Sequence, residues 1–300
     1  MITMRGIKVV LSGFLFLCLL IFLVHQLNIN NFSFSLGNIF AETVELKLSK
    51  EDVIMTAFRK LDAPRVEALM NLEVIDTPDG DVKEIFFRTV SFPLQGVCRN
   101  MKRVGGIWWG RRAVDGDKFV CLDQISDSDV CLIYSFGINN EWSFEDLMDS
   151  FNCEVHAYDF SHSAPAKRGN QISFIKKGIG AETTDILDTL EHFLAMNNHT
   201  DSTVFYLKLD VEGAELQALP QWLESEALKN VQQIAMEIHL YNNVDPVMYK
   251  TLLTAFQQLY ALSFRIISHE VNMPMGKLND GYYELFEIVL MKDTKWNHLN

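Results

Sequence analysis

Short apolar runs alternate with helix-like segments over the second half of the chain. Seven runs have the length and the β-branched content of buried strands. They cover residues 130–135, 154–159, 172–178, 204–210, 231–240, 264–269 and 283–291. Amphipathic segments with helical spacing cover residues 142–151, 184–196, 215–225 and 247–260. Strands that alternate with helices form parallel sheets covered on both faces, so the pattern predicts an α/β fold with a Rossmann-like, seven-stranded sheet. The last two strands are joined by a loop alone, which predicts one antiparallel edge strand.

The first half of the chain has a different pattern. Apolar residues recur at intervals of three and four positions over residues 42–72, which predicts a helical segment interrupted at Pro64. Ser49 and Asp52 give this segment a capping signal near its start. Residues 91–125 contain several Gly and Asp residues and predict loops or a small hairpin.

An uncharged apolar run covers residues 9–24, with Arg5 and Lys8 before it and no Asp, Glu, Lys or Arg after it until Glu42. This run predicts a transmembrane signal-anchor helix at 9–24, and the preceding bases place a short tail, residues 1–8, in the cytoplasm. The chain would then be a single-pass type II membrane protein facing the endoplasmic reticulum or Golgi lumen. The alternative is a cleaved signal peptide and a secreted protein, because residues 40–42 can mimic a cleavage site. Residues 25–85 would form a stem and helical region, and residues 86–300 the α/β domain.

Sequons and cysteines agree with a luminal location. Asn31 and Asn198 each begin an Asn-X-Ser/Thr sequon. Outside the apolar run, the chain has four cysteines: Cys98, Cys121, Cys131 and Cys153. In an oxidising compartment, four cysteines allow three different sets of disulfide pairings. We expect a disulfide between Cys98 and Cys121, because both precede the sheet. We expect Cys131 and Cys153 to be free, buried thiols.

The net charge of −13 argues against nucleic acid as a partner, because phosphate binding needs clustered Lys and Arg. The basic residues between 99 and 112 are the local exception, and we interpret them as a solvated face.

Polar residues stand where the predicted strands end. Gly137 follows the first strand and Asp159 ends the second, a spacing that favours binding of a nucleotide-type cofactor, with the carboxylate on ribose hydroxyls. Asp210 and Glu212 follow the fourth strand. Ligands of open α/β sheets bind outside the carboxyl ends of the strands, so these side chains are candidates for the chemistry.

Four motifs carry a resemblance to a known family. Residues 207–215, Leu-Lys-Leu-Asp-Val-Glu-Gly-Ala-Glu, resemble the acidic signature of FkbM-type methyltransferases. Three further segments resemble more closely the methyltransferase-like protein 24 family: residues 131–145, with Ser-Phe-Gly-Ile-Asn-Asn-Glu-Trp at 135–142, residues 154–159, and Met-Glu-Ile-His at 236–239. The resemblance covers residues 90–295 and implies a class I methyltransferase sheet, S-adenosyl-L-methionine as cofactor and a single-pass membrane anchor. The implied acceptor is unknown and could be a small molecule, a glycan or a protein.

The resemblance also implies roles for individual residues. The cofactor-side residues are Ser135, Gly137, Asn139, Glu141, Asp159 and Gly178. The catalytic, acceptor-side residues are Asp210, Glu212, Glu237 and His239. The chain departs from many class I enzymes at Ser135, where an acid is common, and Glu141 could supply the missing carboxylate.

Methyl transfer requires alignment of the acceptor and removal of its proton. His239 is the expected base, because imidazole titrates near neutral pH, although a core histidine is equally compatible with the sequence. Asp210 and Glu212 would bind acceptor hydroxyls or a hard divalent ion, whereas Glu215 would only begin a helix. The other histidines show no metal-ligand spacing, so no zinc site is expected. The function predicted is an S-adenosylmethionine-dependent methyltransferase, with O-methylation as the expected reaction. A catalytically inactive luminal binding module and a nicotinamide-dependent oxidoreductase are the alternatives.

Overall fold

The structure is a computed structural model of the chain. It describes residues 32–35, 43–46, 49–109, 113–125, 131–240, 244–272, 277–278, 281–283 and 285–294. The predicted membrane segment at 9–24 lies outside these residues. No helix within the described ranges is both long and apolar enough to span a membrane. The chain divides into two compact units, residues 1–57 and 58–300.

In the first unit, strand β1 (Phe32–Ser35) pairs antiparallel with strand β2 (Thr43–Leu46). Helix α2 (Lys50–Met70) begins in this unit and is continuous through Pro64, so the predicted interruption of the helix is wrong. Its start was predicted correctly, because the backbone N–H of Asp52 donates to the hydroxyl of Ser49 (3.1 Å). The strand β2 occupies residues that the apolar spacing assigned to the helix.

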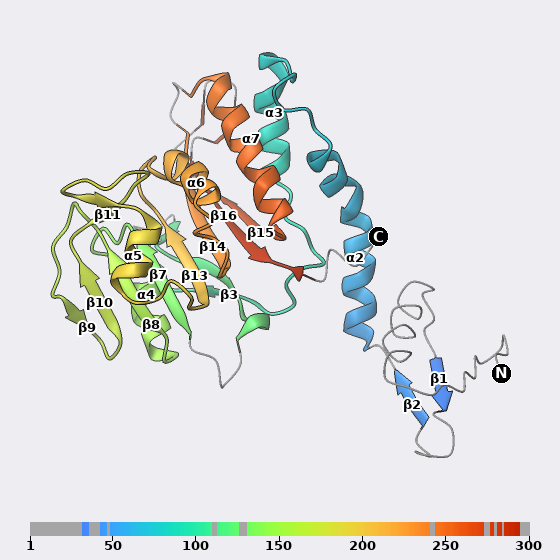
Figure 1. The fold of residues 1–300 in the computed structure, drawn as a ribbon, viewed down its shortest axis with the longest axis horizontal. Helices are drawn as coiled ribbons and strands as arrows, with labels where there is room; N and C mark the ends of the chain where they lie inside the picture. Colours follow the sequence, from blue (N-terminus) through green and yellow to red (C-terminus); the bar gives the residue numbers. More distant parts are fainter. Residues whose placement is uncertain are drawn as a thin grey trace. The chain divides into compact units, whose positions relative to one another are not determined.

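The second unit is built on a sheet of eight strands in the order β15-β16-β14-β13-β7-β8-β10-β9 (Figure 1). The strands are β7 (Leu132–Phe136), β8 (Glu154–Tyr158), β9 (Lys167–Arg168), β10 (Ile172–Ile175), β13 (Val204–Leu209), β14 (Val231–His239), β15 (Phe264–Val271) and β16 (Leu285–Lys292). Seven of these are the predicted strands, and the two-residue strand β9 is the eighth. The predicted strands, numbered along the chain, lie in the order 3-2-1-4-5-7-6. That is the doubly wound order with the seventh strand inserted between the fifth and the sixth.

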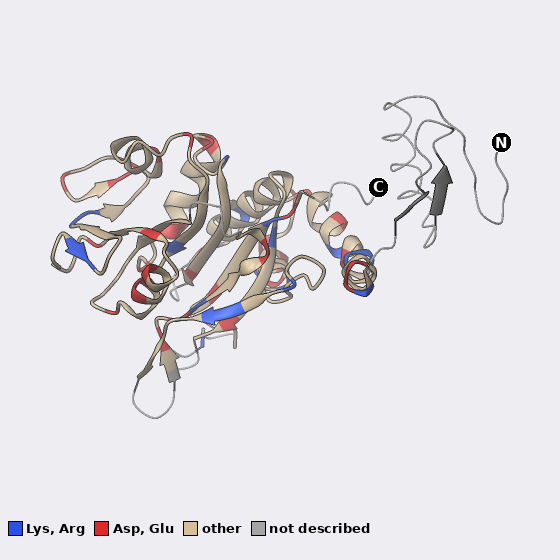
Figure 2. Ribbon diagram, turned by 90° about the horizontal axis from the view of Figure 1, so that it is seen from below, with Lys and Arg blue, Asp and Glu red and all other residues tan. Residues whose placement is uncertain are grey.

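The antiparallel strand lies inside the sheet and not at its edge as predicted. Strand β16 pairs antiparallel with both β14 and β15, which leaves β15 at that edge. At the opposite edge β9 runs antiparallel to β10. Figure 2 shows β9 in the colour of basic residues, because it consists of Lys167 and Arg168.

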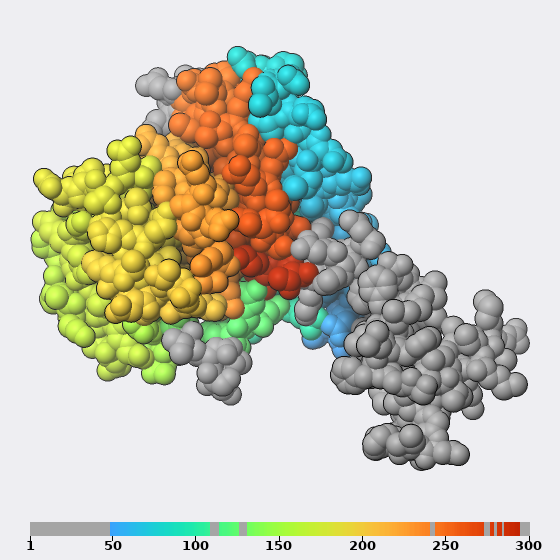
Figure 3. Space-filling model, in the orientation of Figure 1, coloured from blue at the N-terminus to red at the C-terminus, as the bar shows by residue number. Residues whose placement is uncertain are grey.

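Helices α3 (Asp79–Val90) and α7 (Pro246–Ala261) pack side by side near β15 and β16 (Figures 1 and 3). Phe86 of α3 is fully buried and contacts the rings of Tyr249, Phe256 and Phe286. The predicted boundary between the stem region and the domain, at residue 86, falls inside α3. Helices α4 (Ser143–Ser150) and α6 (Glu215–Glu224) have nearly their predicted bounds.

The helix predicted over residues 184–196 is shorter in the structure. Residues Leu187–Asp188 form strand β12 with β11 (Gly178–Ile179), and helix α5 covers only Leu190–Met196. Local polar contacts explain the difference. Thr184 accepts the backbone N–H of Leu187 through its hydroxyl (2.9 Å), and Thr189 caps α5 by accepting from the N–H of His192.

The described residues between 101 and 124 form two nested antiparallel strand pairs and one helical turn. Strand β3 (Met101–Val104) pairs with β6 (Lys118–Cys121), and β4 (Ile107–Trp109) pairs with β5 (Ala113–Asp115). The turn η1 (Leu122–Gln124) follows. The prediction of a small hairpin is confirmed.

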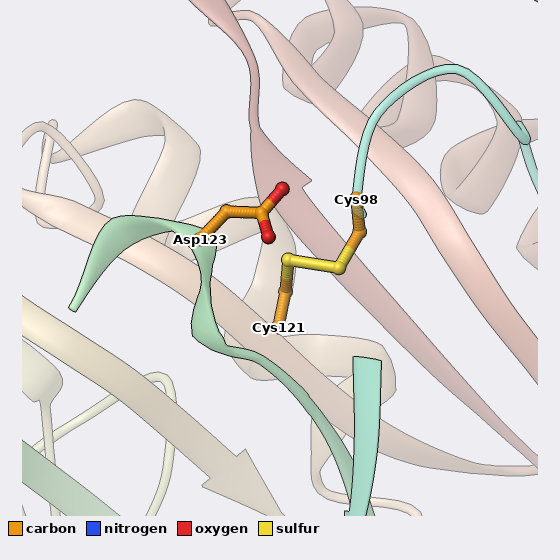
Figure 4. A group of neighbouring side chains, drawn as sticks. All are labelled: Cys98, Cys121 and Asp123. Carbon is orange, nitrogen blue, oxygen red and sulfur yellow. A yellow bond between two sulfur atoms is a disulfide. The ribbon is translucent and has the colours of Figure 1, made fainter. Parts of the chain in front are cut away.

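The described residues contain two disulfides. Cys98 is bonded to Cys121 as predicted (Figure 4), so these sulfurs and the neighbouring Asp123 offer no thiolate set for a metal ion. Cys131 is bonded to Cys153, so the prediction of two free thiols is wrong. The reason is the sheet order: these cysteines directly precede the adjacent parallel strands β7 and β8, which brings their Cα atoms to 4.6 Å.

Candidate active site

The candidate site lies where strands β7 and β13 end side by side. The chain leaves β7 towards β8 on one side and leaves β13 towards β14 on the other, which makes this the topological switch point of the sheet. Gly137 follows β7 with a φ of +79°, in the left-handed region that favours glycine. A Cβ atom on this residue would lie 1.6 Å from the carbonyl oxygen of Asp210, which follows β13. The glycine loop and the first acid are therefore in direct contact.

Asp159 shapes the glycine loop from the end of β8. One carboxylate oxygen accepts the backbone N–H groups of Ile138 (2.9 Å) and Asn139 (2.8 Å). The other accepts the N–H and hydroxyl of Ser161 and the N–H of His162. Burial alone would raise the pKa of Asp159, but these hydrogen bonds outweigh it and lower the pKa to about 2. The carboxylate is therefore ionised and fixed at neutral pH.

Ser135 lies beneath the glycine loop in a buried polar group. Its hydroxyl donates to the carboxylate of Glu145 (2.6 Å), which comes from the first turn of α4. The ammonium of Lys208 lies 3.3 Å from the same carboxylate oxygen and donates to the carbonyl of Gly137 (3.1 Å). Glu145, and not Glu141, thus supplies the carboxylate beside Ser135. Glu141 instead accepts the backbone N–H of Ser143 at the start of α4 (2.8 Å).

Gly178 packs between two side chains on the same side of the crevice. A Cβ atom here would lie 2.7 Å from Phe160 and 2.9 Å from Leu187. Since Phe160 directly follows Asp159, Gly178 lies near the end of β8.

The acids of β13 and β14 meet as the sequence predicts. One donor atom from each of Asp210, Glu237 and His239 lies within 4.8 Å of the others. Burial and the neighbouring Asp210 carboxylate raise the pKa of Glu237 to about 8. Burial acts in the same direction on Asp210, but Lys118 and Lys208 outweigh it and lower the pKa of that carboxyl. The pair therefore holds one proton at neutral pH, on Glu237.

His239 is held by Glu215, the first residue of α6. One carboxylate oxygen of Glu215 lies 3.0 Å from Nδ1 of His239 and accepts its backbone N–H (2.8 Å). Nε2 lies 3.6 Å from Glu212 and 3.7 Å from Glu237. Burial would lower the pKa of His239, but Glu215 and the other carboxylates raise it to about 9.

Two expectations from the sequence change here. His239 is an imidazolium at neutral pH and not the neutral base that its ordinary pKa suggests. Glu215 begins a helix as expected, but its buried side chain also positions His239. The sequence could not show this contact, because it joins residues 24 positions apart through the packing of α6 against β14.

A buried lysine completes the cluster and was missed by the sequence analysis. The side chain of Lys118 is 1% exposed, and its ammonium lies 2.5 Å from Glu287 and 4.0 Å from Asp210. Burial would lower the pKa of Lys118, but these acids raise it. Lone charges inside apolar strands were the available signal, because such residues are rarely buried without a partner. Lys208 and Glu287 follow this pattern, whereas Lys118 begins β6 directly after Asp117 and gives no such signal.

Glu212 stands at the rim of the cluster. Its backbone has a φ of +56°, and its side chain is 77% exposed. Trp108 on β4 is also solvent-exposed, at 74%, so packing against the domain does not hold it in place.

The model of a family described as a methyltransferase domain matches residues 51–284. The chain belongs to this methyltransferase family. Among solved structures, a protein from Streptococcus pneumoniae in complex with S-adenosyl-L-methionine is partly similar, and it is provisionally assigned as a tRNA (m1A22) methyltransferase. The two share 15% sequence identity at a TM-score of 0.33, over 55% of this chain and 67% of that one. No curated protein matches the chain.

The methyltransferase thus places its predicted residues in two groups that touch at Gly137 and Asp210. Asn139 belongs to the glycine loop, Asp159 accepts the backbone N–H groups of that loop, and Gly178 packs against Phe160. Ser135 lies in β7 before the loop, and Glu141 lies at the start of α4. Glu237 and His239 join Asp210 on the other side. Lys118 and His239 supply positive charge that a metal ion would otherwise bring to these acids. Such an arrangement can bind a hydroxyl group and take up its proton.

Proposed function

We propose that this methyltransferase is an S-adenosyl-L-methionine-dependent O-methyltransferase. The observation that carries the proposal is the contact of Gly137 with the backbone of Asp210, whose side chain forms one group with Glu237 and His239 at the switch point of the sheet. The glycine loop and the acid of the second strand are the parts that bind a nucleotide-type cofactor. The second cluster adds groups that can bind an acceptor hydroxyl and take up its proton.

The cofactor side fits S-adenosyl-L-methionine. Gly137 has a positive φ and packs directly against the carbonyl of Asp210, so the loop after β7 lies at the crevice between the two strand ends. Asp159 is ionised beside it, although both of its oxygens accept hydrogen bonds from the protein. The hydroxyl of Ser161 can rotate away from Asp159, so that a ribose hydroxyl takes its place beside the two backbone N–H groups that still donate to that oxygen.

The acceptor side orients a hydroxyl and removes its proton. When bound, the cofactor supplies a methyl group that the sulfonium has already activated. Asp210 is ionised and positioned to accept a hydrogen bond from the acceptor hydroxyl. Glu237 and His239 are protonated at neutral pH, so each becomes a proton acceptor only as the pH rises towards 8 and 9.

The motifs at 131–145, 207–215 and 236–239 support placement within the methyltransferase-like protein 24 family. A luminal, type II topology is part of the same proposal. Two disulfides support it, because disulfides persist in oxidising compartments. Asn198 also supports it, because this sequon asparagine is exposed in the turn after α5. Enzymatic removal of N-glycans should increase the gel mobility of the protein isolated from cells. Asn198→Gln should remove the part of this mobility shift that comes from the glycan at Asn198.

Calorimetry tests the cofactor proposal. The full chain, purified under non-reducing conditions, should release or absorb heat on titration with S-adenosylhomocysteine, and this heat should saturate at one ligand per chain. Asp159→Ala should weaken the binding. Labelling of a microsomal extract with methyl-tritiated cofactor should then identify the acceptor class, with alkali-stable, hydroxyl-linked label expected.

The occupied oxygens of Asp159 favour one alternative, an inactive domain that keeps the fold as a luminal binding module. Absence of heat at millimolar S-adenosylhomocysteine in the folded protein would support that alternative against the enzyme.

A further inference from the structure

Two histidines and a glutamate meet on one face of the sheet, at the end opposite the candidate active site. Glu154 and His156 are the first and third residues of β8, so both side chains point to the same face. His199 follows α5 and reaches the same place, 43 positions further along the chain than His156. One donor atom from each of the three lies within 4.8 Å of the others.

Both imidazoles direct the same nitrogen at one carboxylate oxygen. Nε2 of His156 lies 2.7 Å from Oε1 of Glu154, and Nε2 of His199 lies 3.8 Å from the same atom. Two imidazole nitrogens and one carboxylate oxygen are a ligand set that suits zinc and related transition metals.

The other nitrogen of each imidazole is held by a hydroxyl group. Nδ1 of His199 lies 2.9 Å from the hydroxyl of Tyr134, and Nδ1 of His156 lies 3.1 Å from the hydroxyl of Ser173. Tyr134 is itself fixed, because the side-chain amide of Asn197 donates to its hydroxyl (3.1 Å). A hydrogen bond at the far nitrogen sets the tautomer and the ring orientation of metal-binding histidines.

The surroundings allow a metal ion to enter and to complete its coordination. Glu154 and His199 line a cavity of about 400 Å³ that also contains the polar side chains of Gln124, Ser202 and Gln232. The Cys131–Cys153 disulfide immediately precedes Glu154 and ties the start of β8 to that of β7. The ligand set is therefore anchored on one side and open to water on the other, which leaves a fourth position for a water molecule.

We propose that Glu154, His156 and His199 form a binding site for a divalent transition metal ion of the zinc type. The site is separate from the candidate active site. Glu154 begins the strand whose other end leads to Asp159, a distance of roughly 16 Å at the usual rise per residue of a strand. The sequence could not show it, because only the fold brings His199 next to β8. A metal ion here would join α5 to the sheet and stabilise the turn that carries the sequon at Asn198.

The test is a titration of the full, metal-free chain with Zn²⁺, and with Co²⁺ to follow absorption of the bound ion. The wild-type chain should bind one equivalent of the metal ion at this site. His199→Gln and His156→Gln should each bind the ion at this site at least about a hundredfold more weakly. Glutamine keeps hydrogen-bonding capacity in the same volume, and His199 is partly exposed, so a folded variant is expected at this position. Ser173→Ala removes only the hydroxyl beside His156 and should weaken binding about 10- to 100-fold.

His192→Gln is the matched control. Nδ1 of His192 lies 2.7 Å from the carboxylate of Asp188, so this variant also breaks a His–carboxylate pair, but one with a single histidine. It should bind Zn²⁺ as the wild-type chain does. Equal Zn²⁺ stoichiometry and affinity in the wild-type chain and in His199→Gln would overturn the proposal, as would equal losses in His199→Gln and His192→Gln. None of these results depends on methyl transfer.

Discussion

The two sides of the crevice hold their carboxylates in opposite ways. On the cofactor side, Asp159 accepts five hydrogen bonds and has a pKa of about 2. On the acceptor side, Glu237 faces Asp210 in a buried place and has a pKa of about 8. Both are strand-end acids, so their position in the fold does not decide their behaviour. What decides it is the partner: backbone donors stabilise the charge of Asp159, whereas a second carboxylate opposes that of Glu237.

This difference predicts opposite pH dependences of stability. The pKa of Asp159 is lowered by folding, so its contribution is present above about pH 4 and is lost as the pH falls towards 2. The pKa values of Glu237 and His239 are raised by folding. Their contributions are therefore present at low pH and are lost as the pH rises through about 8 and 9.

The largest expected effect comes from the point where the two sides touch. Gly137→Ala forces a side chain into a left-handed residue and against the carbonyl of Asp210. We expect it to lower the free energy of unfolding by roughly 4 kcal/mol and to abolish cofactor binding. Denaturant unfolding measures the first effect and calorimetry the second. Gly80→Ala is the control, because nothing lies within 4 Å of its added Cβ in helix α3, and it should leave stability equal or slightly higher.

Removal of a cation should damage the acceptor side alone. Lys118→Met leaves Glu287 and Asp210 without the buried ammonium between them. We expect a loss of about 3 kcal/mol in the free energy of unfolding and a higher pKa of Asp210. Lys118→Arg should lose less, because the charge remains. Unchanged stability in Lys118→Met would show that this ion pair does not hold the cluster together.

The pH profile of the reaction distinguishes the structure from the sequence. An ordinary histidine base would give a rate that levels off above pH 7. Because the pKa values of Glu237 and His239 are about 8 and about 9, kcat/KM should instead rise between pH 7 and 9. Glu215→Gln removes the main charge that raises the pKa of His239 and should move the upper limb to lower pH. A profile that is flat above pH 7 would argue against both groups as proton acceptors.

The smallest effect is expected at the rim. Glu212→Gln should change kcat/KM by less than about threefold, because the side chain is mostly in water, where its interactions are weak. Glu226→Gln is the control, since Glu226 is also exposed and also has a positive φ, of +61°. A large loss of activity at Glu212 alone would place this carboxylate in contact with the acceptor.

Much of the fold was predictable from local patterns. Seven apolar runs predicted seven strands of the sheet, and the spacing of Gly137 and Asp159 predicted their approach, because both depend on strand ends. The predicted meeting of Asp210 with Glu237 and His239 follows from the pairing of β13 with β14.

Long-range partners were not predictable. Lys118 reaches Glu287 across 169 positions, and Glu215 reaches His239 through the packing of α6. The pKa of His239 depends on that second contact, so the sequence could not show that this imidazole takes up a proton from the acceptor only near pH 9. The Cys131–Cys153 bond was missed for a related reason, since its formation depends on which strands are neighbours.

The most direct test of the account is calorimetric titration of S-adenosylhomocysteine into Asp159→Ala and Asp210→Asn, with turnover measured on the same preparations. We expect Asp159→Ala to weaken binding, because the glycine loop loses the acceptor of its N–H groups. We expect Asp210→Asn to bind the ligand nearly as the wild-type chain does but to lose methyl transfer. Equal loss of binding in the two variants, or full turnover in Asp210→Asn, would contradict the division of the crevice into a cofactor side and an acceptor side.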